Sequence, residues 1–143
     1  MRASGRRATA AILLVVFGLL TMTACQPPDA NPSHVYINTW SGPTKVQNDT
    51  GYRAHIDRAE VIRQARTYPS SGNCDGPAQP PEPLTFPVTL IPPQGGSVPL
   101  PSFAMGDGTT TVKVYFTLVA SRGPDGQPVT GVAQMTWVAC AIQ

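Results

Sequence analysis

His55 and Asp57 are the residues whose types and spacing come nearest to a catalytic pair. In an extended strand the two side chains would lie on the same face, where a carboxylate can orient an imidazole base or share a metal ion with it. A hydrolase would also need a nucleophile such as Ser70 or Ser71, and neither serine has a nucleophile-elbow signature around it. We therefore expect no catalytic residues, and we interpret His55 and Asp57 as polar residues on a solvated strand face.

No other set of side chains predicts catalysis or metal binding. The acidic residues are scattered, and no two have the spacing of an acid/base pair. The Gly-Asp-Gly sequence at 106–108 lacks the further carboxylates of a calcium loop. No glycine-rich phosphate loop opens a helix. We expect neither a metal ion nor a cofactor.

Four arginines recur over the middle of the chain, at Arg53, Arg58, Arg63 and Arg66. As a stripe they could attract an anionic lipid or polymer near a bilayer. Asp57 and Glu60 lie among them, however, so the favoured interpretation is mutual pairing on a solvated face.

The start of the chain has the pattern of a secretory signal. Residues 1–7 contain three arginines and no acidic residue, and residues 8–20 (ATAAILLVVFGLL) are apolar or small throughout. This run is shorter than the roughly 20 residues of a membrane-spanning helix, so we interpret residues 1–24 as a signal peptide that is removed. Its removal leaves seven basic against eight acidic residues. Such a chain lacks the basic face of a nucleic-acid-binding protein, and we expect no nucleic-acid partner.

The signal ends in Met22-Thr23-Ala24-Cys25, with small residues before a cysteine. This tetrapeptide resembles the bacterial lipobox, in which leucine is preferred at the position of Met22. The resemblance implies cleavage between Ala24 and Cys25, a diacylglycerol on the Cys25 thiol, and acylation of the new amino end, as by palmitate. It implies a lipid-anchored lipoprotein on the extracytoplasmic face of the cell membrane. The alternative is an ordinary secretory signal cleaved near Ala24, with Cys25 free or in a disulfide.

Lipidation of Cys25 would leave Cys74 and Cys140 as the other thiols of an odd set of three. Because an exported chain meets oxidising conditions, we expect a Cys74–Cys140 disulfide that fastens a proline-rich loop to the last strand. In the chain-entropy account, closing a loop of that length would stabilise the fold by about 4 kcal/mol. A redox-active or metal-bound thiol pair is disfavoured, since the spacing is not C-x-x-C.

Short alternating segments dominate the rest of the chain. Residues 25–33 form the lipidated cysteine and a tether, and the three prolines of residues 26–33 predict that this tether is extended. Strands are predicted over residues 34–40, 44–48, 84–91, 109–120 and 129–141, the last two paired as an antiparallel hairpin. Because proline has no N–H for the ladder, Pro87 predicts that the strand over 84–91 lies at a sheet edge or contains a bulge. Turns are predicted at 48–51 and 94–97, and a long proline-rich loop at 70–83.

Residues 52–66 (YRAHIDRAEVIRQAR) fit two interpretations. Their residue types suit a helix, but their apolar positions do not form one clean helical stripe. Read as a strand, Tyr52, Ala54 and Ile56 share a face, and a bulge near Arg58 and Ala59 resets the register. We favour a strand first, with a helical turn later as the open alternative.

Short strands, frequent turns and no long helical pattern predict an all-β fold, an antiparallel β-sandwich over residues 34–143. The turn at 48–51, a cysteine in a loop, and the turn at 92–97 before another strand resemble small immunoglobulin-like domains of exported actinobacterial proteins. That resemblance implies an immunoglobulin-like fold class and carries no activity.

We therefore expect a lipid-anchored, non-catalytic β-sandwich that binds an envelope protein or a surface ligand. The aromatic residues that could supply binding anchors are Tyr36, Trp40, Tyr52, Tyr68 and Trp137. One of the two tryptophans is expected in the core. Two alternatives remain: a carrier of a small apolar ligand, which would need an internal cavity, and a small exported hydrolase, which would need a nucleophile beside His55 and Asp57.

Overall fold

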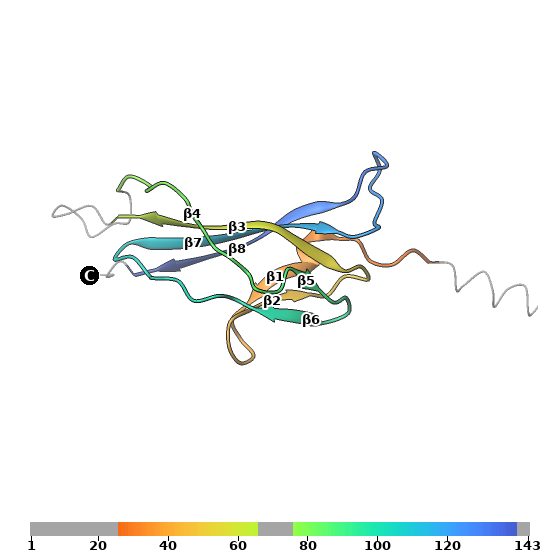
Figure 1. Ribbon diagram of the computed structural model, residues 1–143, viewed down its shortest axis with the longest axis horizontal. Coiled ribbons are helices and arrows are strands. Elements are labelled where there is room, and N and C mark those ends of the chain that lie inside the picture. Colours follow the sequence, from red (N-terminus) through yellow and green to blue (C-terminus); the bar gives the residue numbers. More distant parts are fainter. Residues whose placement is uncertain (1–25, 66–75, 140–143) are drawn as a thin grey trace, which may run out of the picture.

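The computed structural model describes residues 26–65 and 76–139, which form short and long strands and one 3-10 helical turn (Figure 1). In chain order the elements are η1 (Pro32–His34), β1 (Val35–Asn38), β2 (Lys45–Asn48), β3 (Ala54–Gln64), β4 (Glu82–Pro83), β5 (Leu90–Ile91), β6 (Gly96–Pro99), β7 (Thr109–Leu118) and β8 (Thr130–Val138). Cys25, Cys74 and Cys140 lie outside the described residues, as do Ala24, Ser70 and Ser71.

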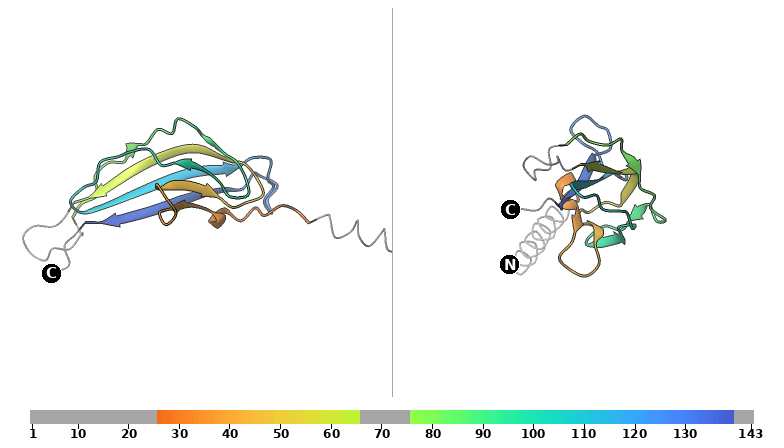
Figure 2. Two further views of the ribbon diagram at one scale, coloured as in Figure 1. Left: turned by 90° about the horizontal axis from the view of Figure 1, so that it is seen from below. Right: turned by 90° about the vertical axis from the view of Figure 1, so that its left-hand side faces the viewer.

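Two antiparallel sheets pack face to face. The three-stranded sheet has the order β1-β2-β6, and the five-stranded sheet has the order β4-β3-β7-β8 with β5 paired to β3. The long strands β3, β7 and β8 lie side by side, and the three-stranded sheet covers one half of their length (Figures 1 and 2). The predicted all-β sandwich is confirmed.

The core follows the alternation of β7, the most regular strand. Val112, Val114, Phe116 and Leu118 are at most 1% exposed, while the residues between them are half-buried on the outer face. Val46 and Val98 of the three-stranded sheet are buried opposite, because inward residues of both sheets interdigitate in a sandwich. The pattern of residues 109–120 predicted this face correctly.

Residues 54–64 form the single strand β3 and contain no helical turn. Ala54 and Ile56 face inward, and then Ala59 and Val61 do, so the buried positions change from even to odd numbers. A register shift between Ile56 and Arg58 produces this change, because one extra residue in a strand reverses every later side chain. The strand interpretation is confirmed, with its bulge one or two positions earlier than predicted.

The predicted hairpin is also confirmed. Nine successive pairs join β7 to β8, from Thr109 with Val138 to Thr117 with Thr130, without a register shift. Beyond β7 the chain turns at Ala120, whose φ is 62°. The buried Ser121 hydroxyl closes this turn by donating to the Leu118 carbonyl at 2.7 Å and accepting from the Val129 N–H at 2.9 Å.

The single strand predicted over 84–91 is wrong. Only Leu90–Ile91 is a strand there, and β4 instead occupies Glu82–Pro83, at the end of the predicted loop. Pro87 has no N–H to donate, so the segment around it leaves the ladder. It is held by a side chain instead, since Phe86 is only 6% exposed.

The sequence interpretation also missed β6. Gln94 and Gly95 form the predicted turn, with φ of 57° and 90°, but Gly96 and Ser97 already pair with β2. A strand that begins with glycine and ends with proline has little strand propensity of its own. It is fixed by the buried Val98 and by its pairing with β2.

The predicted turn at 48–51 is built around a buried amide. Asn48 is fully buried, and its Nδ2 donates to the carbonyl oxygens of Tyr52 at 2.7 Å and Pro92 at 3.2 Å. Its Oδ1 accepts from the Thr50 N–H at 3.1 Å and from the Thr50 hydroxyl at 2.7 Å. Since buried amides need partners, this residue connects the turn to the segment before β6.

The expectation of an extended tether over 26–33 is wrong from Pro28 onward. The Asp29 carbonyl accepts from the Gly51 N–H at 2.8 Å, and Ala30 packs against the core. A Cβ on Gly51 would overlap that of Pro28, and one on Gly131 would lie 2.8 Å from Cβ of Pro32. The segment is therefore part of the domain, with η1 packed on the start of β8.

Candidate functional site

The loop of residues 39–44 between β1 and β2 is pinned by one buried side chain. Asn38 is 7% exposed, and its Oδ1 accepts from the Trp40 N–H at 2.9 Å. Its Nδ2 donates to Oγ of Ser41 at 3.2 Å and to Oε1 of Gln47 at 2.8 Å. An asparagine that bonds backbone two residues ahead makes an Asx-turn, which restricts the loop to few conformations.

This loop presents an aromatic side chain to solvent. Trp40 is 88% exposed, the largest value among the exposed large hydrophobic residues. The loop projects from the body of the sandwich beside β2 (Figure 1). Tryptophan is among the side chains that most often dominate the energy of a protein interface, because it offers a large rigid surface at low entropic cost.

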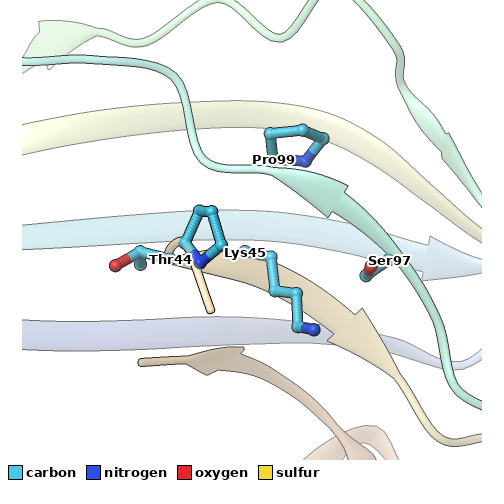
Figure 3. Close-up of a pocket in the computed structure, with 5 residues that line it drawn as sticks. Thr44, Lys45, Ser97 and Pro99 are labelled. Carbon is cyan, nitrogen blue, oxygen red and sulfur yellow. The ribbon is translucent and has the colours of Figure 1, made fainter. Parts of the chain in front are cut away.

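A shallow pocket of about 170 Å³ lies next to the loop (Figure 3). Its lining residues are Pro43, Thr44, Lys45, Ser97 and Pro99, which come from the loop, the start of β2 and β6. The register places Lys45 directly opposite Pro99 on the outer face of the three-stranded sheet. The pocket is smaller than the ~300 Å³ that is usual for a drug-sized ligand, so it suits a single side chain of a partner.

A second hollow of about 130 Å³ continues this surface around the edge of β6. Its lining residues are Phe86, Pro87, Val88, Val98, Pro99 and Pro101. Pro99 belongs to both hollows, and Val88 is 55% exposed. We call the loop 39–44 and these two hollows the Trp40 surface.

The rest of the outer face of this sheet is a polar network. The Tyr36 hydroxyl donates to Oδ2 of Asp49 at 2.8 Å, and Nε2 of Gln47 donates to Oδ1 of the same carboxylate at 2.8 Å. The hydrogen bond to the carboxylate, aided by partial desolvation, raises the pKa of Tyr36 above its ordinary value. Tyr36 therefore stays a neutral donor, and the side chains around the Trp40 surface are already oriented.

His55 and Asp57 lie together on the outer face of the five-stranded sheet, as predicted. Nδ1 of His55 is 2.9 Å from Oδ1 of Asp57, and Oδ2 of Asp57 accepts from the Thr117 hydroxyl at 2.6 Å. The hydroxyl bonds to the carboxylate and not to the imidazole, so the three groups do not have the order of a Ser-His-Asp triad, in which the imidazole contacts the hydroxyl. Both members of the pair are nearly half exposed, which is typical of a solvated surface.

Arg58 and Arg63 do not belong to one stripe, and Arg66 lies outside the described residues. Arg58 lies 3.7 Å above the Tyr115 ring on the outer face and bonds to Glu60 at 3.2 Å. Arg63 faces inward because of the bulge, and there it binds Glu82 at 2.7 Å and the Ala104 carbonyl at 2.8 and 2.9 Å. The predicted pairing on a solvated face is confirmed for Arg58, whereas Arg63 pairs with a different carboxylate on the inner face.

The second tryptophan is structural, as expected for one of the two. Trp137 is partly buried, and its ring centroid lies 5.5 Å from that of Phe103 in a tilted arrangement. The sequence named Trp40 as a possible anchor, but it did not single out the pocket.

Over residues 26–65 and 76–139, no three His, Cys, Asp or Glu side chains gather as metal ligands. No helix in these ranges is long and apolar enough to cross a membrane.

Comparison with protein-family models finds no matching family, and comparison with curated proteins and with solved structures finds no match. The functional assignment therefore depends on the residues and the geometry described above.

Proposed function

We propose that this protein is a lipoprotein of the bacterial cell envelope, anchored through acylated Cys25, whose β-sandwich binds an envelope protein or a surface ligand without catalysis. The observation that carries the binding function is Trp40, fully presented to solvent by a loop that a buried asparagine holds in place. The anchor is supported by the lipobox-like sequence after an apolar signal.

The docked segment before β1 gives the anchor a short reach. The first backbone hydrogen bond to the domain is made by Asp29, only a few residues after Cys25. An extended chain advances about 3.5 Å per residue, so such a linker spans roughly 10 to 15 Å. A domain held this closely would keep the end that carries Gly51 and η1 against the bilayer.

Trp40 stands on the loop whose end lines a small pocket, and this arrangement favours a protein partner over an apolar cargo. The two hollows lie on the surface, and neither could enclose a lipid-sized molecule. An exposed tryptophan beside a pocket of side-chain size is the usual form of a binding hot spot. The partner would bury Trp40 and fill the pocket with one of its own side chains.

The anchor is tested by mass spectrometry of the full chain extracted from membranes. We expect an N-terminal peptide that begins at Cys25 and carries a diacylglycerol. Replacement of Cys25 by alanine should release the protein from the membrane fraction. An unmodified Cys25 thiol in the wild-type chain would contradict the proposal.

The binding surface is tested by site-specific photocrosslinking in intact cells. A crosslinker at Ser97, which lines the pocket, should capture a defined partner, whereas one at Val119, which is 42% exposed on a different loop, should not. Trp40→Ala should weaken capture from Ser97 at least tenfold, as removal of an interface hot spot does. Equal capture from both positions would refute a role for the Trp40 surface.

A further inference from the structure

The sheet edges of this protein are protected to very different degrees. The edge strand β6 ends in Pro99, and the two-residue strand β4 contains a charged residue and Pro83. Short length, proline and charge are the devices that keep an edge strand from pairing with another chain. The edge strand β8 has none of them: its nine residues (TGVAQMTWV) include no proline and no charge, and its pairing with β7 has no bulge.

Two hydrogen bonds at the ends of β8 show which of its residues direct their backbone groups toward β7. The Leu118 N–H donates to the Val129 carbonyl at 2.8 Å, and the Ala139 N–H donates to the Gly108 carbonyl at 3.0 Å. In an antiparallel ladder alternate residues bond to the neighbouring strand, so the odd-numbered residues of β8 bond to β7. The even-numbered residues direct their N–H and C=O groups to the open edge, where no described strand pairs with them.

The first half of β8 is packed against other elements. Pro32 of η1 packs on the inner face at Gly131, and β1 contacts β8 as well. Figure 2 shows η1 and β1 beside this half of the strand. The second half, from Gln134 to Val138, extends beyond the three-stranded sheet (Figure 1). Three residues there present a donor and an acceptor each, at Gln134, Thr136 and Val138.

The inward side chains beside this half of the edge are apolar and incompletely covered. Met135, Trp137 and Phe103 are only partly buried. A strand added to the edge would place alternate side chains on this strip and remove it from water.

We propose that a second copy of the chain is the occupant, and that two β8 strands pair antiparallel about a two-fold axis through Thr136. The hydrogen-bonding pattern of β8 permits this register. Gln134 of one copy then lies opposite Val138 of the other, and both direct their unpaired backbone N–H and C=O groups toward the partner strand. About six new hydrogen bonds would form. The inference uses the described domain alone and does not depend on the proposed anchor or partner.

The side chains complement themselves in this register. Thr136 meets Thr136 of the second copy on the outer face, a favourable cross-strand pair. Met135 meets Trp137 of the second copy on the inner face, where thioether and aromatic ring attract each other. Because the strand is uncharged, pairing with itself brings no like charges together. The two five-stranded sheets become one continuous sheet.

Cysteine crosslinking of the full chain in its native membranes tests the register. Thr136→Cys places two thiols on the axis at a separation within the range of a disulfide. Thr130→Cys is the matched control, an exposed threonine on the same face at the other end of the strand, far from the axis. Mild oxidation should convert T136C to a dimer on a non-reducing gel, well above the level reached by T130C and by the wild-type chain. Equal crosslinking of T136C and T130C, or a T136C crosslink only to a different polypeptide, would overturn the proposal.

A charge-swap experiment tests the interaction itself. Sedimentation velocity of the full chain in mild detergent should show a dimer for the wild type and for Thr130→Lys, but a monomer for Thr136→Lys, since two lysines would meet on the axis. Thr136→Glu should behave likewise, and an equimolar mixture of T136K and T136E should recover the dimer. A wild type that remains monomeric up to about 100 µM, or a T136K variant that dimerises normally, would refute the two-fold pairing.

Discussion

The side-chain oxygen of Asn38 accepts a hydrogen bond from the backbone N–H of Trp40 at 2.9 Å, so a buried amide positions the most exposed aromatic side chain of the described residues. The two residues have different roles in the loop. Asn38 supplies conformational order, and Trp40 supplies contact surface.

Asn38→Ala should lower the free energy of unfolding by about 1 to 3 kcal/mol, because the Trp40 N–H loses its acceptor and Oε1 of Gln47 loses its donor. Urea denaturation measures the loss. Ser41→Ala is the control, since it removes only the 3.2 Å hydrogen bond to the hydroxyl and should change stability little. Equal effects of the two substitutions would contradict the pinning role of Asn38.

The two tryptophans should respond in opposite ways to replacement by alanine. Trp40→Ala should leave the midpoint of thermal unfolding unchanged, because the side chain is 88% exposed. Trp137→Ala should cost about 2 kcal/mol or more, since it removes the packing on Phe103. Fluorescence offers a second check: W40A should retain the emission of a shielded indole and W137A that of a solvated one. A marked loss of stability in W40A would show that the loop supports the fold.

Gly131→Ala should destabilise the protein by about 1 to 3 kcal/mol. The added Cβ would lie 2.6 Å from Cζ of Phe116 and 2.8 Å from Cβ of Pro32, so the buried ring or η1 would have to move. Gly106→Ala is a matched control, because its Cβ would meet nothing nearer than 3.6 Å. Thermal unfolding of the two variants compares them directly, and a stable G131A would disprove the close packing of η1 on β8.

The hydrogen bond from Tyr36 to Asp49 should make stability depend on pH at the alkaline end. The folded-state pKa of Tyr36 is raised above 10.0, so the bond contributes fully below that pH and is lost as the pH rises through the higher folded value. Asp49→Asn should return the pKa of Tyr36 toward its ordinary value, which absorbance titration of the tyrosines measures. The wild-type chain should also lose more stability than Tyr36→Phe between neutral pH and about pH 11. Identical titration curves for D49N and the wild type would contradict this account.

Sequence reasoning succeeded where a side-chain pattern decides the structure. The alternation from Val112 to Leu118 predicts both the strand and its buried face, and the broken pattern before Ala59 predicts a bulge in β3. It failed where a segment takes its structure from the neighbouring segment that it packs against or pairs with. Gly96 begins a strand only because β2 lies beside it, and Pro28 leaves the expected tether because Gly51 leaves room for it.

The candidate site was only partly predictable for the same reason. Exposure of Trp40 and burial of Trp137 depend on where each loop and strand lies in the sandwich, so the residue type could not separate them. His55 and Asp57 were correctly placed on one face, because strand periodicity alone determines it. The pocket joins β2 to β6, a strand that the sequence did not predict.

The unequal protection of the sheet edges also limits how far the protein can assemble. Polymers that grow by strand addition need two receptive edges on every molecule, as amyloid fibrils do. Within the five-stranded sheet, Pro83 makes the edge strand β4 a poor acceptor, whereas β8 at the opposite edge remains receptive. Growth of this sheet through β8 would therefore end at a pair of molecules.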